Sequence, residues 1–436
     1  MKTHPRRIGT VGASLVLVGA MLLPSITVQA RSHSADQVTI NYWYAGGGAP
    51  LKAANKVAQL FMKTHPTIHV VVTGVPIPSN AIATNQKLMT AVLSGSPPDV
   101  AYMDGGVITS WGARNALTAV DPYVTTSGIK PSDYDKAHWD GTQWAGHTWG
   151  LPMEDDGIGF LYWNKDLFKK AGLDPEKPPT TIAQLDQTID KLTIKKNGKY
   201  AQIGMIPWLG VGQYLALWGG AFGGSWYDQK THKITADSPG LVKALTWEVG
   251  WAKKLDIANV DTFVSGFTSS INDAFISGHV AMVADGVWRV GSLEQYAPKM
   301  HWGISYLPSP DGHKSLYVAG EYVVMPKGSK HPKEAFELMK FMSGPQGIVP
   351  WSKDNSYYPS NVAATKDPYF NRTPARRVIT SLLPYGYSWP SLPMADLYWD
   401  TMTRAEDQAR HLKISPQAAL AGVSTQMQPE LQKYIH

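Results

Sequence analysis

The chain has 436 residues, which is too long for one small core and comfortable for two lobes. Its hydrophobic content of 43% is ordinary for a globular protein and argues against a disordered chain or a multi-span membrane protein. The net charge is +6 without any dense run of Lys and Arg interleaved with aromatic residues, so no nucleic-acid partner is expected. The absence of cysteine excludes disulfides, thiolate metal sites and cysteine nucleophiles.

The N-terminal segment has the pattern of a cleavable signal peptide over residues 1–30. One lysine and two arginines precede an apolar run at 8–23, and small residues occupy Val28 and Ala30, the positions that a signal peptidase reads. The alternative is a membrane anchor. Removal of three positive charges from the net +6 leaves +3. Because Arg31 stands where a lipid-modified cysteine would be needed, we expect an exported protein, periplasmic or extracellular, that is not a lipoprotein.

The first half of the mature chain alternates strand and helix patterns. Runs rich in β-branched and aromatic residues indicate strands, and apolar residues at helical spacing indicate helices. The expected elements are a strand at 38–44, a helix at 51–61, a strand at 68–72, a helix at 81–93 and a strand at 99–103. Such alternation is typical of a parallel sheet covered on both faces.

A second block of the same kind begins near Leu151. The expected elements are strands at 157–163, 279–284 and 321–325, and helices at 166–171, 181–192, 241–255, 271–276, 332–342 and from 416 onward. Pro332 at the start of a helix and Gly344 at its end show the usual asymmetry of helix termini. The whole chain therefore has the pattern of two α/β lobes.

Four segments carry a family resemblance. They are Ser94–Val100 (SGSPPDV); Gly150–Pro152 with Leu161–Phe168; Ala274–Met282 with Gly286–Trp288; and Tyr322–Lys327 with the helix after it. In this order and spacing the chain resembles the extracellular solute-binding family of bacterial ABC importers, of the maltose-binding-protein-like, carbohydrate type.

The resemblance implies an α/β, two-lobe periplasmic-binding-protein-like fold, in which each lobe is a mainly parallel sheet covered by helices and the ligand cleft lies between the lobes. The N-terminal lobe would comprise 31–152 and 318–370, and the C-terminal lobe 153–317 and 371–436. The chain would cross between lobes three times, near 151–154, 316–320 and 365–377.

A sugar presents hydroxyl edges and apolar faces, so its site needs carboxylates and flat aromatic rings. Trp288 matches the recurrent cleft aromatic of the family, with packing under a loop as its alternative role. Tyr398 and Trp399 resemble the C-terminal cleft aromatic, with a register uncertain by one residue. Trp208 lies in a Gly-rich stretch where the family often places ligand aromatics, together with Tyr214 and Trp218.

Further candidates lie at strand ends and crossings. They are Trp43, Met103 and Asp104 at the ends of strands, Asp155 and Asp156 at the first crossing, and Glu321 at the second. The alternative for Asp104 is a helix N-cap, and for the acidic pair a solvated hinge.

These residues predict capture of a small polar solute, a mono- or oligosaccharide, and its delivery to the membrane permease subunits of an ABC importer. We expect no catalytic residue, metal or cofactor, because hydrolase, phosphate-loop and metal motifs are missing. We also expect a monomer. Three alternatives stay open: a secreted carbohydrate-active enzyme using Glu154 or Asp156, a binding protein for a non-sugar solute, and a sensor subunit.

Overall fold

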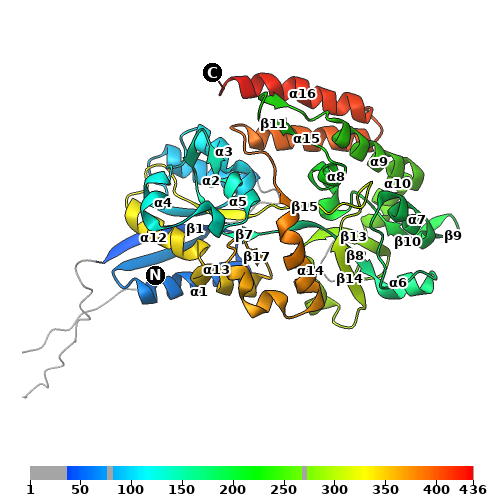
Figure 1. The fold of residues 1–436 in the computed structure, drawn as a ribbon, viewed down its shortest axis with the longest axis horizontal. Coiled ribbons are helices and arrows are strands. Elements are labelled where there is room, and N and C mark those ends of the chain that lie inside the picture. The colour runs from blue at the N-terminus through cyan, green and yellow to red at the C-terminus, as the bar shows by residue number, and fades with distance from the viewer. Residues whose placement is uncertain (1–36, 76–81, 268–272, 436) are drawn as a thin grey trace, which may run out of the picture. The chain divides into compact units, whose positions relative to one another are not determined.

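Two sheets organise the described part of the protein. The structure is a computed structural model that describes residues 37–75, 82–267 and 273–435, so the predicted signal peptide lies outside it. The five-stranded sheet has the order β2-β1-β3-β16-β6, and the seven-stranded sheet has the order β18-β15-β8-β13-β10-β9 with β14 beside β8 (Figure 1). The strands of the first sheet are β1 (Val38–Ala45), β2 (Ile68–Val75), β3 (Val100–Asp104), β6 (Leu151–Pro152) and β16 (Glu321–Val324).

The strands of the second sheet are β8 (Ile158–Asn164), β9 (Ile194–Lys196), β10 (Lys199–Met205), β13 (Val280–Gly286), β14 (Trp302–Tyr306), β15 (Leu316–Tyr317) and β18 (Gly386–Tyr387). Three short ladders are β4 (Gln143–Trp144) with β5 (His147–Thr148), β7 (Glu154–Asp155) with β17 (Tyr358–Pro359), and β11 (Tyr227–Asp228) with β12 (Lys233–Ile234).

The helices of the first half are α1 (Gly48–Thr64), α2 (Ile82–Leu93), α3 (Gly105–Ala113), α4 (Asp121–Ser127), α5 (Lys136–Gly141), α6 (Lys165–Lys170), α7 (Ile182–Leu192) and α8 (Leu215–Ala221). Those of the second half are α9 (Pro239–Leu255), α10 (Ile257–Val264), α11 (Trp288–Tyr296), α12 (Pro332–Ser343), α13 (Pro345–Asn355), α14 (Pro374–Leu382), α15 (Ala395–Arg410) and α16 (Pro416–Gln432). Short 3₁₀ turns are η1 (Pro131–Asp133), η2 (Gly210–Gln213), η3 (Ala364–Lys366), η4 (Pro368–Asn371) and η5 (Leu383–Tyr385).

Both faces of the first sheet are buried, which explains its continuous apolar strands. On β3, Val100 and Tyr102 belong to the core formed with α1 and α12, whereas Ala101 and Met103 belong to the core formed with α2 and α3. In Figure 1, α1 and α13 lie on one side of β1, and α2 and α3 lie on the other. The period of two along the strand therefore divides its side chains between two cores.

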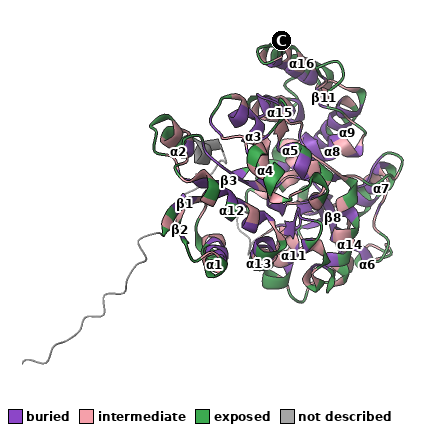
Figure 2. Ribbon diagram, turned by 60° about the vertical axis from the view of Figure 1, so that its left-hand side comes forward, coloured by how far each residue is buried: buried purple, intermediate pink, exposed green. Residues whose placement is uncertain are grey.

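The second sheet is covered in the same way. On β8, Leu161 and Trp163 join the core that includes α7, α9 and α16, while Phe160 and Tyr162 join the core formed with α11 and α14. The buried residues of β8 and its neighbours are purple in Figure 2.

The pairing of the strands is mixed, which corrects the expectation of mainly parallel sheets. β1 pairs in parallel with β2 and β3, as expected, but β16 runs antiparallel to β3. In the second sheet, β8 is antiparallel to β13, β14 and β15, and only β10 with β13 and β15 with β18 are parallel among the described pairs. The antiparallel pairing follows from the positions at which the strands begin. β8 and β16 each start directly after the chain has passed from one sheet to the other, so they run away from the crossing. Their neighbours β13 and β3 run toward the crossing.

Two of these crossings are hydrogen-bonded to each other. The chain passes from the first sheet to the second between Pro152 and Ile158, and back between Tyr317 and Glu321. The Met153 amide donates to the Glu321 carbonyl at 3.1 Å, and β7 also pairs with β17. Residues Val38–His436 form one compact unit, and the division into two lobes at the predicted boundaries stays a prediction.

Several predicted helix boundaries are confirmed by their caps. Thr181 forms a capping box with Gln184 at the start of α7, and Ser415 accepts from the amide of Ala418 at the start of α16. The short helix predicted at 271–276 is wrong over its described part. Residues 274–278 form turns. The Asp273 carboxylate accepts hydrogen bonds from the amides of Phe275 and Ile276, so these amides are satisfied without a helix.

Within the described residues, no helix has the length and apolar character needed to cross a membrane.

A tight approach at Gly105 gives the first testable prediction. A Cβ added at Gly105 would lie 2.2 Å from Cε2 of Tyr322 and 2.9 Å from the Gly320 carbonyl oxygen. Gly105→Ala is therefore expected to lower the free energy of unfolding by about 1–3 kcal/mol, measured by urea denaturation followed by circular dichroism. Gly250→Ala is the control, since nothing lies within 4 Å of its added Cβ in the middle of α9, and equal losses from the two variants would contradict the steric argument.

Candidate functional site

Three carboxylates meet where the first two crossings run side by side. Glu154, Asp156 and Glu321 each offer an oxygen, and these oxygens all lie within 4.8 Å of one another. Glu154 and Asp156 share a face because they are two residues apart on an extended segment, whereas Asp155 between them points the other way. We call Glu154, Asp156 and Glu321 the acid cluster.

Glu154 is the anchored member of the acid cluster. Its two oxygens accept hydrogen bonds from the Tyr102 hydroxyl and from Nε1 of Trp351, and the side chain is 1% exposed. Burial raises the pKa of Glu154, and the hydrogen bonds from Tyr102 and Trp351 oppose that rise. Both oxygens of Glu154 are therefore held by side chains of the core formed with α1 and α12, which we call the first core.

Asp156 and Glu321 carry oxygens without a partner. Asp156 Oδ1 and Glu321 Oε2 are buried and accept no hydrogen bond from the residues that the structure describes. Burial and the neighbouring carboxylates raise the pKa of both side chains well above the ordinary range. A buried polar atom without a partner is costly, so these two carboxyl groups are the natural hydrogen-bonding partners of a bound molecule.

A first group of aromatic rings near the acid cluster comes from β1 and β3, from the segment between α13 and β17, and from the first residue of α11. Tyr44 packs against Tyr102 with ring centroids 4.8 Å apart, and Trp288 meets Tyr357 edge-on at 6.3 Å. Burial, followed by Glu154 and its neighbours, raises the pKa of Tyr44, and burial, followed by Asp156, raises that of Tyr357. Trp288 and Tyr357 are half-buried, so each keeps an open part of its ring.

A second group of rings comes from the junction of η2 and α8, from β15 and from α15. Trp399 is half-buried and lies 5.1 Å from Tyr214 and 6.5 Å from Tyr317, the latter ring nearly parallel to it at 20°. Burial, then Asp104 and Asp156, raises the pKa of Tyr317. Tyr317 stands opposite Ile158 in the strand register, two residues from Asp156, and Trp399 packs beside Tyr317. We call Tyr214, Tyr317 and Trp399 the aromatic wall.

Asp104 combines a structural role with an open position. Its Oδ1 accepts from the Gly106 amide at 2.7 Å and caps α3, which was the alternative role considered for it. Asp104 also stands opposite Glu321 in the strand register. Desolvation by the surrounding protein raises the pKa of the Asp104 carboxyl group. The side chain is nevertheless exposed to solvent, and this combination is expected of a residue that lines a concave surface.

The other predicted site residues lie elsewhere. Met103 and Asp155 are each 1% exposed, and Tyr398 is fully buried with its hydroxyl donating to the Trp226 carbonyl at 2.8 Å. Trp43 faces the α2 side of the first sheet. Trp208, at the start of the loop to η2, packs against the core that includes α7, α9 and α16, which we call the second core. The structure therefore brings together Asp104, Asp156, Trp288, Glu321 and Trp399 of the ten predicted residues, and buries three of the others inside the fold.

Asp155 belongs to a separate buried group beside the crossings. His138 lies 2.7 Å from Asp135 through Nδ1, and its Nε2 contacts the Ala319 carbonyl at 2.9 Å. Burial works to lower the pKa of His138, but Asp135 and Asp155 outweigh it and raise the pKa to about 10. Burial raises the pKa of Asp155 to about 7 against the pull of His138. This group and the acid cluster are the two sets of described side chains whose spacing suits a metal ion, and we assign no metal to either.

Sequence reasoning missed four aromatic residues of this region: Tyr44, Tyr102, Tyr317 and Tyr357. The signal for Tyr44 was the alternation of β1, in which Trp43 and Tyr44 must face opposite sides of the sheet. Tyr357 and Tyr317 lie in short segments without periodicity, and only the tertiary fold brings them to the acid cluster.

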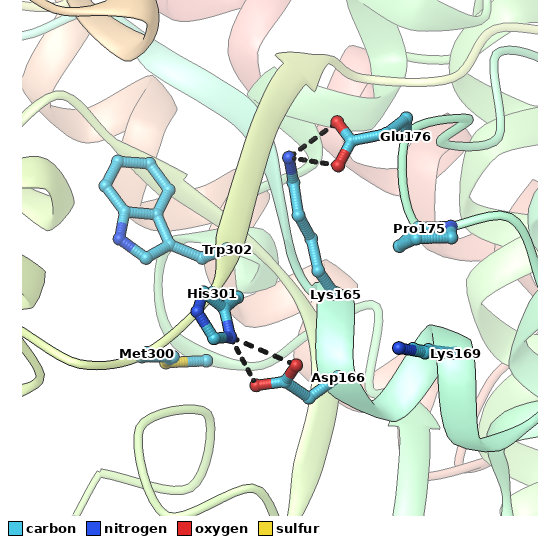
Figure 3. A pocket seen from close by; sticks show the side chains of 8 residues that line it. All are labelled: Lys165, Asp166, Lys169, Pro175, Glu176, Met300, His301 and Trp302. Atoms are coloured by element: carbon cyan, nitrogen blue, oxygen red, sulfur yellow. Dashed lines mark hydrogen bonds and ion pairs between the residues drawn. The ribbon is translucent and has the colours of Figure 1, made fainter.

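A surface pocket lies away from these residues, between α6 and β14 (Figure 3). It has a volume of about 430 Å³, and four of the side chains that line it are paired: Lys165 with Glu176 at 2.6 Å and Asp166 with His301 at 3.1 Å. None of the ten predicted residues lines it.

Comparisons with known proteins agree with this architecture. The fold is that of the periplasmic binding proteins, a class of two-sheet proteins whose chain crosses repeatedly between the sheets. Residues 45–348 match the bacterial extracellular solute-binding protein family, so the chain belongs to that family.

Three similar proteins illustrate the range of the family. The structure of CpMnBP1 with mannobiose bound has a TM-score of 0.77 and 30% identity, covering 89% of this chain and 99% of that one. The maltotriose-binding protein of Pyrococcus abyssi is 22% identical over 404 residues, 90% of this chain and 81% of that protein. An ABC substrate-binding protein of Listeria monocytogenes in complex with cycloalternan has a TM-score of 0.75 and 22% identity, covering 91% and 100%.

Proposed function

We propose that the protein is an exported solute-binding protein that captures a carbohydrate between its two lobes and delivers it to the permease subunits of an ABC importer. Membership of the extracellular solute-binding family supports export and transport. The similarity to CpMnBP1, whose structure contains mannobiose, supports a saccharide as the ligand. The protein would act as a monomer without a lipid anchor.

The observation that carries the proposal is that two buried carboxyl groups near aromatic rings each have an oxygen without a hydrogen-bond partner among the described residues. Asp156 and Glu321 would form hydrogen bonds with the hydroxyl groups at the edge of a sugar ring. Trp399 on one side and Trp288 on the other would pack against its apolar faces.

The same geometry disfavours the alternative of a glycoside hydrolase. Glu154 lies beside Asp156 in the acid cluster, but both of its oxygens are engaged by Tyr102 and Trp351. A general acid or nucleophile has to reach the glycosidic bond, and a carboxylate locked in the first core does not.

Capture would follow from lobe closure. The acid cluster lies on the crossings, Trp288 and Trp399 pack with the second sheet's helices, and Asp104 lies at the end of β3 in the first sheet. A ligand that contacts both lobes binds the closed state more tightly than the open one, and this difference in affinity shifts the population toward closure.

Titration calorimetry with mannobiose, mannotriose and maltotriose tests the proposal. The wild-type protein is expected to bind at least one of these sugars, and Trp399→Ala is expected to weaken that binding about thirtyfold, since truncation of an aromatic anchor costs about 2 kcal/mol. Chromatography of the sugar after long incubation should show no product.

Trp302→Ala is the matched control, because Trp302 is also half-buried but lines the pocket of Figure 3. Absence of binding to every sugar of the panel would overturn the carbohydrate assignment. Equal weakening by the two tryptophan variants would remove Trp399 from the site.

A further inference from the structure

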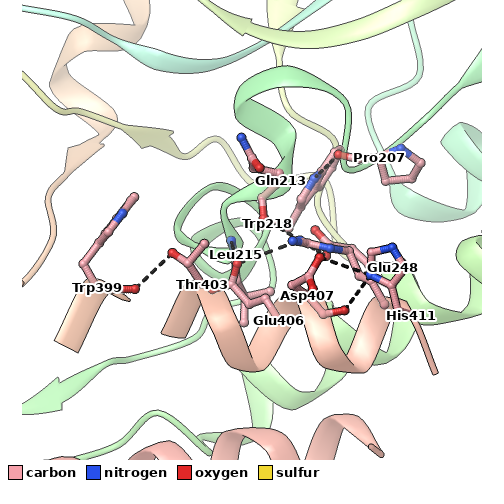
Figure 4. A network of polar contacts seen from close by, with 11 residues as sticks. Pro207, Gln213, Leu215, Trp218, Glu248, Trp399, Thr403, Glu406, Asp407 and His411 are labelled. Carbon is pink, nitrogen blue, oxygen red and sulfur yellow. Dashed lines mark hydrogen bonds and ion pairs between the residues drawn. The ribbon is translucent and has the colours of Figure 1, made fainter. Parts of the chain in front are cut away.

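A buried network of charges joins α9 and α15 within the second core (Figure 4). Arg410 Nη1 lies 3.4 Å from Glu248 Oε2 and 3.9 Å from Glu406 Oε2. The three side chains are 4%, 0% and 3% exposed, so solvent screens their interactions little. They come from two helices, Glu248 from α9 and the other two from α15.

Burial of this network of charged groups is energetically unfavourable for the core. Two carboxylates face one guanidinium, and Glu248 Oε1 has no hydrogen-bond partner among the described residues. Burial raises the pKa of Glu248 to about 8 and that of Glu406 to about 7 against the opposing effect of Arg410. Apolar residues of similar volume often stabilise a core as well as a buried ion pair or better, so the network calls for a reason other than stability.

The network holds the backbone of the loop that carries Tyr214. Glu406 Oε2 accepts from the Leu215 amide at 3.1 Å, at the first residue of α8, and Arg410 Nη1 donates to the Gln213 carbonyl at the end of η2. Tyr214 lies between these two anchored peptide groups. Figure 4 shows Gln213 and Leu215 next to Glu406.

The same helix also carries the partner of Tyr214 in the wall. Trp399, Glu406 and Arg410 are seven and then four residues apart, which places them along one face of α15. Trp399 contacts the Tyr214 ring at 5.1 Å. The relative position of the two rings is therefore set by Glu406 and Arg410, which fix the η2–α8 loop to the helix from which Trp399 projects.

We propose that Glu406 and Arg410 are positioning residues for ligand binding, which hold Tyr214 against Trp399 in the geometry that the ligand meets. The expected effect on ligand affinity rests on the proposed carbohydrate function, whereas the anchoring of the η2–α8 loop does not. A purely stabilising network would be replaceable by apolar residues without loss of affinity; a positioning network would not.

The test compares Glu406→Leu with Glu406→Gln. Glutamine keeps an oxygen that accepts from the Leu215 amide, whereas leucine removes the acceptor and leaves that amide buried and unpaired. Glu406→Leu is expected to bind mannobiose about tenfold more weakly and to exchange the Leu215 amide hydrogen about tenfold faster, while Glu406→Gln stays within about threefold of wild type in both. Calorimetry gives the affinity, and hydrogen exchange of the ligand-free protein gives the amide rate.

The two measurements separate this inference from the proposed function. If the wild-type protein does not bind mannobiose, the ligand assignment fails for that sugar, while unchanged exchange at Leu215 in Glu406→Leu would overturn the anchoring by itself. Faster exchange with unchanged affinity would also overturn the positioning role. Glu337→Leu, on the exposed face of α12, is the control and should change neither quantity. Should Glu406→Leu not fold, Arg410→Lys is measured in the same way, and it is expected to show both changes because lysine lacks the guanidinium fork.

Discussion

Replacement of Trp351 by alanine is expected to lower the free energy of unfolding by about 3–5 kcal/mol. Trp351 is fully buried in the first core, with its ring 5.4 Å from Tyr44 and 5.7 Å from Tyr102. Its Nε1 also donates to Glu154, which would lose one of its two donors. The variant therefore combines a large cavity with a less satisfied buried carboxylate, and urea denaturation followed by tryptophan fluorescence and circular dichroism measures the sum.

Tyr434→Ala is the control for this loss. Tyr434 is 37% exposed near the C-terminus, so its truncation should change the free energy of unfolding by less than about 0.5 kcal/mol. A loss of comparable size in both variants would show that the ring contacts around Trp351 contribute little, contrary to the account given for the first core.

The second large effect is a fall in stability as the pH rises. In the unfolded chain Glu248 and Glu406 release their protons near their ordinary pKa of 4.5, but in the folded protein burial raises these values to about 8 and about 7. Between these limits the folded state binds more protons than the unfolded state, so the contribution to stability is fully present below pH 4.5 and is lost as the pH rises through 8.

Other groups act in the same direction. Burial raises the pKa of Asp155 from 3.8 to about 7, and the partners of His138 raise its pKa from 6.5 to about 10, which extends the fall to higher pH. For Glu248 alone, the rise of the pKa from 4.5 to about 8 limits the loss of unfolding free energy to about 5 kcal/mol, at about 1.4 kcal/mol per pH unit. The free energy of unfolding measured in urea at intervals from pH 5 to 9 should therefore decrease steadily.

The variant Glu248→Gln assigns part of this fall to one residue. Glutamine stays neutral across the range, so the decrease between pH 5 and 8 should become shallower. Glu337→Gln on the surface of α12 should leave the slope unchanged. A stability that stays level or rises over this range in the wild-type protein would refute the assigned pKa directions.

The elements were predictable from sequence where local chemistry decides the structure. Thr181 with Gln184, Pro332 and Ser415 marked helix starts because side chains there satisfy free amides or fit the first turn. The direction of β8 was not predictable in this way, because an isolated strand has the same pattern whether its neighbours run parallel or antiparallel.

The site was predicted only in part for a similar reason. The sequence indicated Trp43 and Tyr398 together with Trp399, but an aromatic residue one position along a strand or helix faces another direction. On β1 the ring near the acid cluster is Tyr44, and on α15 it is Trp399, with Tyr398 turned into the core. Which of two neighbouring residues meets a ligand depends on how the element packs, and that is fixed by contacts distant in sequence.

The pairing of the two crossings has a mechanical consequence. Met153 bonds to Glu321 and Asp156 to Ala319, so these links form a narrow ribbon instead of two independent tethers. A ribbon flexes readily across its thin dimension and resists shear within its plane, because shear would stretch the bonds between its edges. We therefore expect the axis of the proposed lobe closure to be set by this backbone pairing before a ligand binds.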